Sequence, residues 1–370
     1  MAEDTKYIAT MNELLLRAVK NVLWISLRRP SYAYFAFKTI LTQRKAARLR
    51  LSLERSGVHV PPYLIASITN RCNLRCKSCF AQAHHRPAGE ELSAQRWREV
   101  MSEAEALGIS VVFVAGGEPL VRKEILDISR DLKNTLFVMF TNGLLIDEDA
   151  LSRFKKQPNT IPMISMEGVG QDTDVRRGAG VYARILEKIN KLRGARILFG
   201  VSITVTRDNY ETVTSEQFLR TVSGLGAKII FFIEFIPVEE GTGEKTVTDA
   251  QRESLGKHVD ALNARREALF VQFPGDEKIY DGCLAAGRGF VHIGPGGELE
   301  PCPFAPFSDT NIKQRPLKEA LQSLFLKKIR DNHCRLDETG SGCALWENRR
   351  WVQSLLTETS SPKSGYDNNL

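Results

Sequence analysis

One stretch of the sequence decides the fold: YLIASITNRCNLRCKSCF, residues 63–80. Its opening segment, Tyr63–Thr69, is apolar and predicts a buried strand. The loop that follows carries Cys72, Cys76 and Cys79 with the spacing C-x3-C-x2-C. Three thiolates in one loop can hold three corners of a cubic iron–sulfur cluster, and the fourth corner then stays open to another ligand. We therefore expect a 4Fe–4S cluster with one reactive iron at the end of this strand.

Two other uses of these cysteines stay open at this point. A zinc site normally draws on paired C-x2-C units and four ligands, and no second pair follows nearby. A disulfide framework belongs to secreted chains, and the N-terminus lacks the apolar core and cleavage site of a signal peptide. Seven cysteines without such a signal indicate a reducing cytoplasm and metal binding. The cluster is the favoured interpretation, ahead of zinc and structural thiols.

A second motif, Gly116-Gly117-Glu118-Pro119, follows the apolar segment Ile109–Ala115. Glycines allow a backbone to approach a ligand closely, and a carboxylate accepts hydrogen bonds from an ammonium group. On its own this motif also fits an ordinary turn after a strand. Its place about 40 residues beyond the cysteine loop, after the next strand, makes a ligand site the stronger interpretation.

The two motifs together resemble the signature of the radical SAM superfamily. The resemblance implies that the three cysteines hold a 4Fe–4S cluster, that its open iron binds S-adenosylmethionine (SAM), and that the glycine motif meets the methionine end of SAM. It also implies reductive cleavage of SAM to methionine and a 5′-deoxyadenosyl radical, which abstracts hydrogen from a substrate. One departure is Ser78, which stands where relatives often have an aromatic residue; here Phe80 follows the third cysteine instead.

Six apolar segments alternate with amphipathic ones between residues 63 and 236 and predict six β/α units. Parallel strands need crossover helices, and strands covered on both faces form continuous apolar runs. We expect strands at Tyr63–Thr69, Ile109–Ala115, Leu136–Thr141, Ile161–Met166, Ile197–Val205 and Ile229–Ile236. Helices are expected at Ser93–Leu107, Tyr182–Leu192, Glu211–Leu225 and over 249–268. The predicted fold class is α/β, a partial (β/α)6 barrel, which the resemblance also implies.

Ligands bind at the carboxyl ends of parallel strands, and polar residues gather there in this sequence. Asn142 follows the third expected strand, Ser165 and Glu167 end the fourth, and Ser202 lies in the fifth. We expect these four residues to contact the cofactor, and a turn is an equally good explanation for the pair on the fourth strand. Glu234 ends the sixth strand. An acid in an apolar strand is either paired or functional, so Glu234 is the candidate catalytic residue.

The C-terminal part of the chain carries four further cysteines: Cys283, Cys302, Cys334 and Cys343. The segment HIGPGGELEP at 292–301 predicts a β-hairpin that brings the first two thiols to one side. This arrangement resembles the auxiliary-cluster domains called SPASM or twitch, although it lacks their dense second cysteine set. The resemblance implies a second 4Fe–4S cluster, and a zinc ion on the same thiols is the alternative. Asp276, Tyr280 and Asp281 are expected to border the substrate.

The N-terminal segment is strongly basic. Residues 17–55 contain ten Lys or Arg residues and a single acid, Glu54, whereas the whole chain has a net charge of +7. We expect helices over 11–27 and 32–53. The favoured role is packing on the barrel, followed by an anionic membrane surface and then by nucleic acid, for which no module is visible. The segment also holds five aromatic residues: Trp24, Tyr32, Tyr34, Phe35 and Phe37.

These patterns predict five parts. They are an N-terminal helical extension (1–60), the barrel (61–245), a linking helix (246–275), an auxiliary-cluster domain (276–356) and a disordered tail (357–370). No apolar run reaches the ~20 residues of a membrane span. We therefore expect a cytoplasmic protein, with peripheral binding to the inner membrane face as a further option.

The expected function is radical SAM catalysis on a small-molecule, lipid, tetrapyrrole or peptide substrate, with an electron donor such as flavodoxin or ferredoxin and no nucleic acid partner. The alternative is a non-catalytic iron–sulfur or zinc protein that responds to redox state. The motif at 116–119 argues against this alternative, because a regulator has no need of a site for the amino group of SAM.

Overall fold

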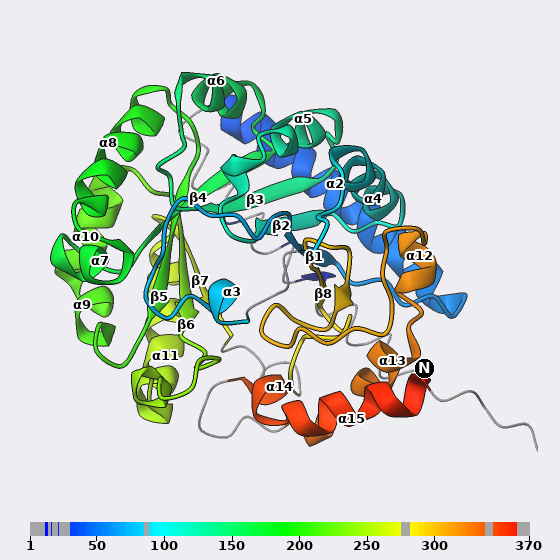
Figure 1. Ribbon diagram of the computed structural model, residues 1–370. Coiled ribbons are helices and arrows are strands. Elements are labelled where there is room, and N and C mark those ends of the chain that lie inside the picture. The colour runs from blue at the N-terminus through cyan, green and yellow to red at the C-terminus, as the bar shows by residue number, and fades with distance from the viewer. Residues whose placement is uncertain are drawn as a thin grey trace, which may run out of the picture.

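A single nine-stranded sheet curves around a central cavity in the computed structural model, with helices along its outer face (Figure 1). The structure describes residues 12, 13, 16, 21, 30–84, 89–274, 282–336 and 343–360. The strand order is β7-β6-β5-β4-β3-β2-β1-β8-β9. Strands that follow one another in sequence therefore lie side by side from β1 to β7, as expected when short helices carry the chain back.

The six expected strands are all present and pair in parallel. They are buried along most of their length, which agrees with their continuous apolar composition. Their bounds are β1 (Tyr63–Ser67), β2 (Val111–Ala115), β3 (Leu136–Thr141), β4 (Thr160–Met166), β5 (Gly200–Val205) and β6 (Ile229–Glu234). The predicted α/β barrel of six units is thus confirmed.

The sheet extends beyond these six strands, and two expectations need correction. The region 246–275, predicted as a linking helix, contains α11 (Asp249–Arg265) and then a seventh parallel strand, β7 (Leu269–Phe273). Arg266 takes a left-handed backbone conformation with φ of 56° and ends the helix, which frees the apolar segment after it to join β6.

The expected hairpin is present but does not form a separate sheet. β8 (Phe290–Ile293) and β9 (Leu299–Glu300) pair in antiparallel fashion, and β8 also pairs in parallel with β1. The C-terminal part of the chain is therefore joined to the barrel by main-chain hydrogen bonds. Its short helices lie beside this end of the sheet: α12 (Leu317–Ala320), α13 (Leu324–Asp331), α14 (Ala344–Glu347) and α15 (Arg349–Ser360).

Side chains, not hydrogen bonds, close the curved sheet at one point. The ring of Phe273 in β7 lies 5.8 Å from the ring of Phe290 in β8, measured between centroids. Phe290 in turn stacks on Tyr63 of β1 at 5.4 Å. Rings at such distances attract each other beyond the area they bury. β7 and β8, the first strand of the hairpin, are thus joined by contacts between rings.

The crossover helices follow the predicted pattern with one difference. In α4 (Ala94–Ala106) the hydroxyl of Ser93 accepts a hydrogen bond from the backbone N–H of Arg96, and Gly108 has a φ of 85° just after the helix. The segment expected as one helix over 211–225 is divided, because Ser215 caps a new helix. The others are α5 (Glu124–Asp131), α6 (Glu148–Lys156), α8 (Val181–Gly194), α9 (Tyr210–Thr214) and α10 (Glu216–Leu225).

The second expected N-terminal helix is present as α2 (Pro30–Arg55), and it packs on the barrel. Gln43 donates to the carbonyl of Ser110 and accepts from its hydroxyl at 2.6 Å, and Arg50 donates to the carbonyl of Gly108. Most of residues 11–27 lie outside the described part of the chain, as do Asp276, Tyr280 and Asp281. At the other end α15 continues to Ser360, past the expected start of the tail, and 361–370 are not described. No helix in the described part is both long and apolar enough to cross a membrane.

Candidate active site

The carboxyl ends of the parallel strands open onto one large cavity. It has a volume of about 720 Å³. Residues from five of the six expected strand ends contribute to its wall, as expected for a parallel barrel. Most of the predicted site residues line it: Cys72, Cys76, Cys79, Gly116, Gly117, Asn142, Ser165, Ser202 and Glu234.

The three cysteines of the first loop are half-buried and lie close together at the mouth of β1. Burial raises the pKa of the Cys72 thiol. The backbone N–H of Leu74 donates to the Cys72 Sγ at 3.4 Å, and this hydrogen bond opposes the shift. Burial also raises the pKa of Cys76, and the positive charge of Arg177 opposes this shift. Thiolates here therefore need a positive partner, which iron ions supply.

The glycine motif packs against the segment that leads into the cysteine loop. The N–H of Gly117 donates to the carbonyl of Thr69 at 2.7 Å, and the N–H of Glu118 donates to that of Arg71 at 2.9 Å. A Cβ atom on Gly117 would lie 2.2 Å from the Arg71 oxygen, and one on Gly116 would lie 2.5 Å from the Thr69 oxygen. The two glycines thus allow one backbone to lie directly on the other, in addition to lining the cavity.

Glu118 is buried behind the cavity wall, not exposed at its surface. Its carboxylate accepts hydrogen bonds from the hydroxyl of Thr141 at 2.7 Å and from the backbone N–H groups of Asn142 and Leu120 at 2.7 and 3.0 Å. Burial raises the pKa of Glu118, and these donors oppose the shift. Pro119 follows as the first residue of the 3₁₀ helix η1 (Pro119–Val121). Contact of this carboxylate with the SAM ammonium group stays a prediction.

Three predicted polar residues do face the cavity. The side chain of Asn142 donates to Asn73 of the cysteine loop at 2.8 Å, and its own oxygen accepts from the N–H of Leu144. The hydroxyls of Ser165 and Ser202 lie 3.1 Å apart on the neighbouring strands β4 and β5. Asn142 is therefore oriented by the loop that carries the cysteines, and the two serines form one polar patch.

Glu167 is paired with two arginines that sequence patterns did not single out. Its buried carboxylate accepts from Arg176 at 2.5 Å and from Arg177 at 2.5 and 2.9 Å. Burial acts to raise the pKa of Glu167, but Arg177 and Arg176 together hold it below its usual value. Both arginines end the short helix α7 (Gln171–Arg177) and line the cavity, so Glu167 supports them from behind.

The arginines also connect α7 to the cysteine loop. The N–H of Lys77 donates to the carbonyl of Arg176 at 2.9 Å, and the Arg176 guanidinium donates to Thr204 at 2.6 Å. Arg177 lies near enough to Cys76 and Cys79 for their charges to raise its own pKa further. Two cations thus stand beside three thiols, which suits a cluster of net negative charge. Arg176 and Arg177 follow Gly170 by six and seven residues, and this spacing carried no recognisable signal in the sequence.

Glu234 lines the cavity but is held by neighbours. It is almost completely buried, and it accepts from Arg252 of α11 at 2.8 Å and from Gln272 of β7 at 2.9 Å. An acid in an apolar strand is either paired or functional, and the contacts of Glu234 show that it is paired. A role in proton transfer stays a prediction for this residue.

The C-terminal cysteines divide into a group of three and one apart. Burial raises the pKa of the Cys302 thiol well above its usual value, and the nearby thiols of Cys343 and Cys283 add to this. Cys302 and Cys343 are buried, Cys283 is half-buried, and Cys334 is exposed in the 3₁₀ helix η4 (His333–Arg335). The three gathered thiols match the donor set of an iron–sulfur cluster.

No three His, Cys, Asp or Glu side chains within the described ranges converge on one point where an ion could bind. Four thiolates on one zinc ion would each lie about 2.3 Å from it. In a cubic cluster each thiolate binds a different iron, so the sulfur atoms stand farther apart.

Two chains of side-chain contacts connect β1 and the segment after the first cysteine loop with the C-terminal part. In one, His292 of β8 lies between Ser67 of β1 and Glu300 of β9, with a contact of 2.7 Å on each side. The expectation that this histidine is a hairpin residue agrees with its place. The other is a row of rings with centroid separations of 5.0, 6.5 and 6.0 Å: Phe304, Phe80, His84 and Trp346. Phe80 and Phe304 line the cavity.

Comparison with known proteins agrees with this geometry. Residues 66–219 match the model of the Radical SAM superfamily. An AdoMet-dependent heme synthase of Methanosarcina barkeri is 27% identical over 320 residues, covering 78% of this chain and 89% of the relative. A PqqA peptide cyclase of Granulibacter bethesdensis is 26% identical over 259 residues, covering 67% and 69%.

Solved structures show the same fold. The crystal structure of Streptococcus suis SuiB bound to S-adenosylmethionine has a TM-score of 0.63 with this chain, covers 90% of it and 80% of SuiB, and is 18% identical. Residues 66–219 form a radical SAM domain, and the similarity to an AdoMet-dependent enzyme over 78% of the chain supports a radical SAM enzyme.

Proposed function

We propose that Cys72, Cys76 and Cys79 hold the SAM-binding 4Fe–4S cluster and that the substrate of the reaction enters the 720 Å³ cavity beside it. The single observation that carries this proposal is that one cavity contains the three thiols, the glycine motif and the polar strand ends. When bound, the cluster and SAM supply an adenosyl radical that removes hydrogen from the substrate.

The chain itself positions and shields these groups. Asn142 and the serine pair face the cavity and offer hydrogen bonds to SAM, while Glu118 fixes the backbone of Asn142 from behind. Arg177 offers positive charge to the cluster, and Glu167 keeps that charge in place. The apolar wall excludes water, which strengthens the electrostatic contacts made inside the cavity.

We also propose a second 4Fe–4S cluster on Cys283, Cys302 and Cys343. Its support is the gathering of these three thiols around the hairpin and α14. Cys334, which is exposed, is the candidate fourth ligand. An electron donor such as flavodoxin or ferredoxin would reduce the first cluster.

An apolar substrate suits the cavity best. Its wall includes the first residues of several strands and thus runs from the cysteines to the amino ends of the barrel. These residues are all apolar or aromatic: Tyr63, Val111, Leu136, Ile229 and Leu269. Three half-buried rings, Phe113, Phe140 and Phe231, meet there at centroid distances of 5.6 to 6.0 Å. We therefore propose a lipid-like or tetrapyrrole molecule, handled in the cytoplasm at the inner membrane face.

A peptide substrate is the second candidate, and one observation favours it. The names of several relatives mention peptides. One relative is a PqqA peptide cyclase, and a solved structure shows SuiB bound to its precursor peptide SuiA. The heme synthase relative points instead to a tetrapyrrole.

The proposal is tested with anaerobically reconstituted protein under a chemical reductant. Full-length protein should contain about eight irons per chain, two cubes of four, and should release 5′-deoxyadenosine from SAM. The triple variant Cys72→Ala, Cys76→Ala, Cys79→Ala should lose about half the iron and all SAM cleavage. Continued 5′-deoxyadenosine release by this variant would disprove the assignment, and zinc in place of iron would disprove both clusters.

A further inference from the structure

The outward face of α2 is unusual for a helix that already packs on a barrel. It carries four large apolar side chains with high exposed fractions: Tyr34 at 72%, Phe37 at 55%, Leu41 at 50% and Leu49 at 36%. The first three recur at i, i+3 and i+7 and therefore stand on one stripe. Apolar groups placed together in this way indicate a contact surface.

Basic side chains border the same stripe. Arg44, Lys45 and Arg48 are exposed among the apolar residues, and Lys38 is half-exposed beside them. The one acid in α2 is Glu54, near its end, and its carboxylate contacts His59 at 3.0 Å. The outward face of α2, meaning Tyr34, Phe37, Lys38, Leu41, Arg44, Lys45, Arg48 and Leu49, therefore carries positive charge and apolar surface without a negative group.

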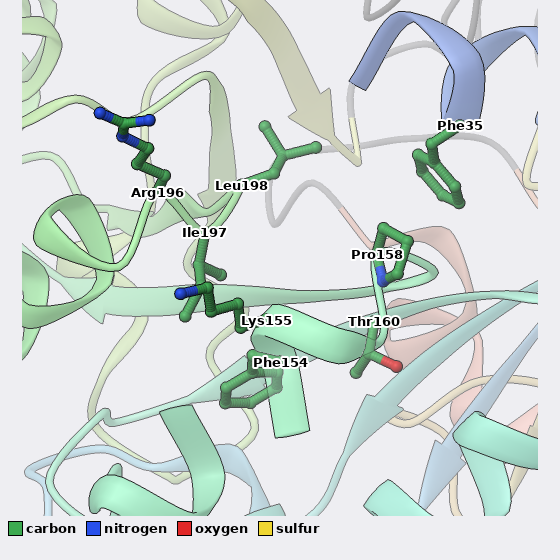
Figure 2. Close-up of a pocket in the computed structure, with 8 residues that line it drawn as sticks. All are labelled: Phe35, Phe154, Lys155, Pro158, Thr160, Arg196, Ile197 and Leu198. Carbon is green, nitrogen blue, oxygen red and sulfur yellow. The ribbon is translucent and has the colours of Figure 1, made fainter. Parts of the chain in front are cut away.

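The opposite face of α2 reaches the active-site cavity. Phe35 and Thr39 belong to its wall, together with the apolar strand starts. Phe35 also borders a small separate cavity of about 30 Å³, where it faces Pro158, Thr160 and Leu198 at the amino ends of β4 and β5 (Figure 2). α2 thus lies between the amino end of the cavity and the exterior.

We propose that the outward face of α2 docks on an anionic lipid bilayer. A helix with an apolar stripe flanked by cations binds such a surface, because the apolar groups enter the headgroup boundary and the cations pair with lipid phosphates. This places the amino end of the cavity against the membrane. Under the function proposed above, on which this consequence rests, the substrate is then a lipid that reaches the cavity beside α2.

The docking is measured by sedimentation of the full-length protein with vesicles, one set of phosphatidylcholine alone and one of phosphatidylcholine mixed with phosphatidylglycerol. Wild-type protein should bind the anionic vesicles and should dissociate from them as the salt concentration is raised. The variant Arg44→Gln, Lys45→Gln, Arg48→Gln should bind roughly 100-fold more weakly, because each cation near an anionic leaflet contributes about 1 kcal/mol. The variant Tyr34→Ser, Phe37→Ser, Leu41→Ser should bind the anionic vesicles at least roughly tenfold more weakly, because it lacks the apolar side chains that enter the headgroup boundary.

A charge-matched variant provides the control. Arg220, Lys257 and Lys327 are exposed basic residues of α10, α11 and α13, so none of them belongs to α2. Their replacement by Gln should leave vesicle binding unchanged. Equal binding to neutral vesicles, or equal loss in this control, would overturn the proposal. Retained binding of the apolar variant to anionic vesicles would show that charge alone holds the protein there, and would overturn the role given to the apolar stripe.

Catalysis is followed separately in the same samples. All three variants should release 5′-deoxyadenosine at the wild-type rate when no vesicles are present, since none of the changed residues lines the cavity. Loss of vesicle binding with intact SAM cleavage supports the docking surface. Absence of SAM cleavage in the wild type would instead contradict the proposed function and leave the docking result standing.

Discussion

At the scale of single residues, the glycine motif acts as a spacer between two backbones. Gly117 lines the cavity, yet its tightest contact is with the main chain at Arg71, one residue before the first cysteine. The sequence predicted a glycine that makes room for a ligand. The structure adds that the same glycine sets the position of the loop that carries the thiols, so the two motifs depend on each other.

The substitution Gly117→Ala should therefore remove the first cluster while leaving the fold. A Cβ 2.2 Å from the Arg71 oxygen forces the loop away, because backbone atoms cannot yield as a flexible side chain can. Iron content should fall by about half and SAM cleavage should stop. Gly224→Ala is the matched control: nothing lies within 4 Å of its added Cβ, so iron content should stay constant. Normal iron content in Gly117→Ala would contradict this role.

At the scale of elements, strands were easier to predict than charged pairs. The strands of a covered parallel sheet are continuous apolar runs, so all six appeared in the sequence. β7 was missed because Leu269–Phe273 is short and follows directly on a helix, and Glu167 was expected at the cofactor because its arginine partners lie nine and ten residues away on α7. Such pairings depend on how the chain folds back, which residue types and spacing do not encode.

The ion pairs of Glu167 should make α7 a pH-sensitive element. Replacing Glu167 by Gln leaves two partly buried guanidinium groups without their carboxylate and should lower the free energy of unfolding by about 3 kcal/mol at neutral pH. The pKa of Glu167 is lower in the folded state, so its stabilisation is present above the unfolded pKa and is lost as pH falls through the folded pKa. Denaturant titrations of both proteins should therefore converge in acid.

A solvent-exposed carboxylate serves for comparison in this experiment. Glu187 of α8 is 58% exposed and lies 3.8 Å from Lys188 and 3.6 Å from Lys191, so Glu187→Gln should change stability by less than about 1 kcal/mol at either pH. A difference between wild type and Glu167→Gln that stays constant down to strongly acidic pH would show that the lost contact is not electrostatic.

At the scale of the whole molecule, the two cysteine groups belong to one body. The His292 chain joins β1 to β9, and the row of rings joins the segment after the first cysteine loop to Phe304 and Trp346. The sequence predicted the hairpin and both groups of thiols, but it gave no means of ranking the four C-terminal cysteines. Only the fold shows that three of them gather and that Cys334 is exposed.

This arrangement predicts unequal effects for two neighbouring cysteines. Cys343→Ala should remove the second cluster, about half the iron, because its thiol lies buried beside Cys302. Cys334→Ala, the matched control, should retain most of it. SAM binding should persist in both, since neither residue lines the cavity. Iron analysis with electron paramagnetic resonance of the reduced protein checks this, and equal loss in the two variants would assign Cys334 as a fourth ligand.

The pairing of β1 with β8 has a consequence for how the chain is made. Ser67 and His292, which meet across this pair, are 225 residues apart in sequence. During synthesis the strand that precedes the cysteine loop therefore emerges early and keeps one bare edge until most of the polypeptide has left the ribosome. An uncovered edge invites pairing with other chains, and distant pairings form slowly. A nascent chain that stops short of residue 290 should accordingly aggregate, and the C-terminal third cannot be cut away as an independent unit.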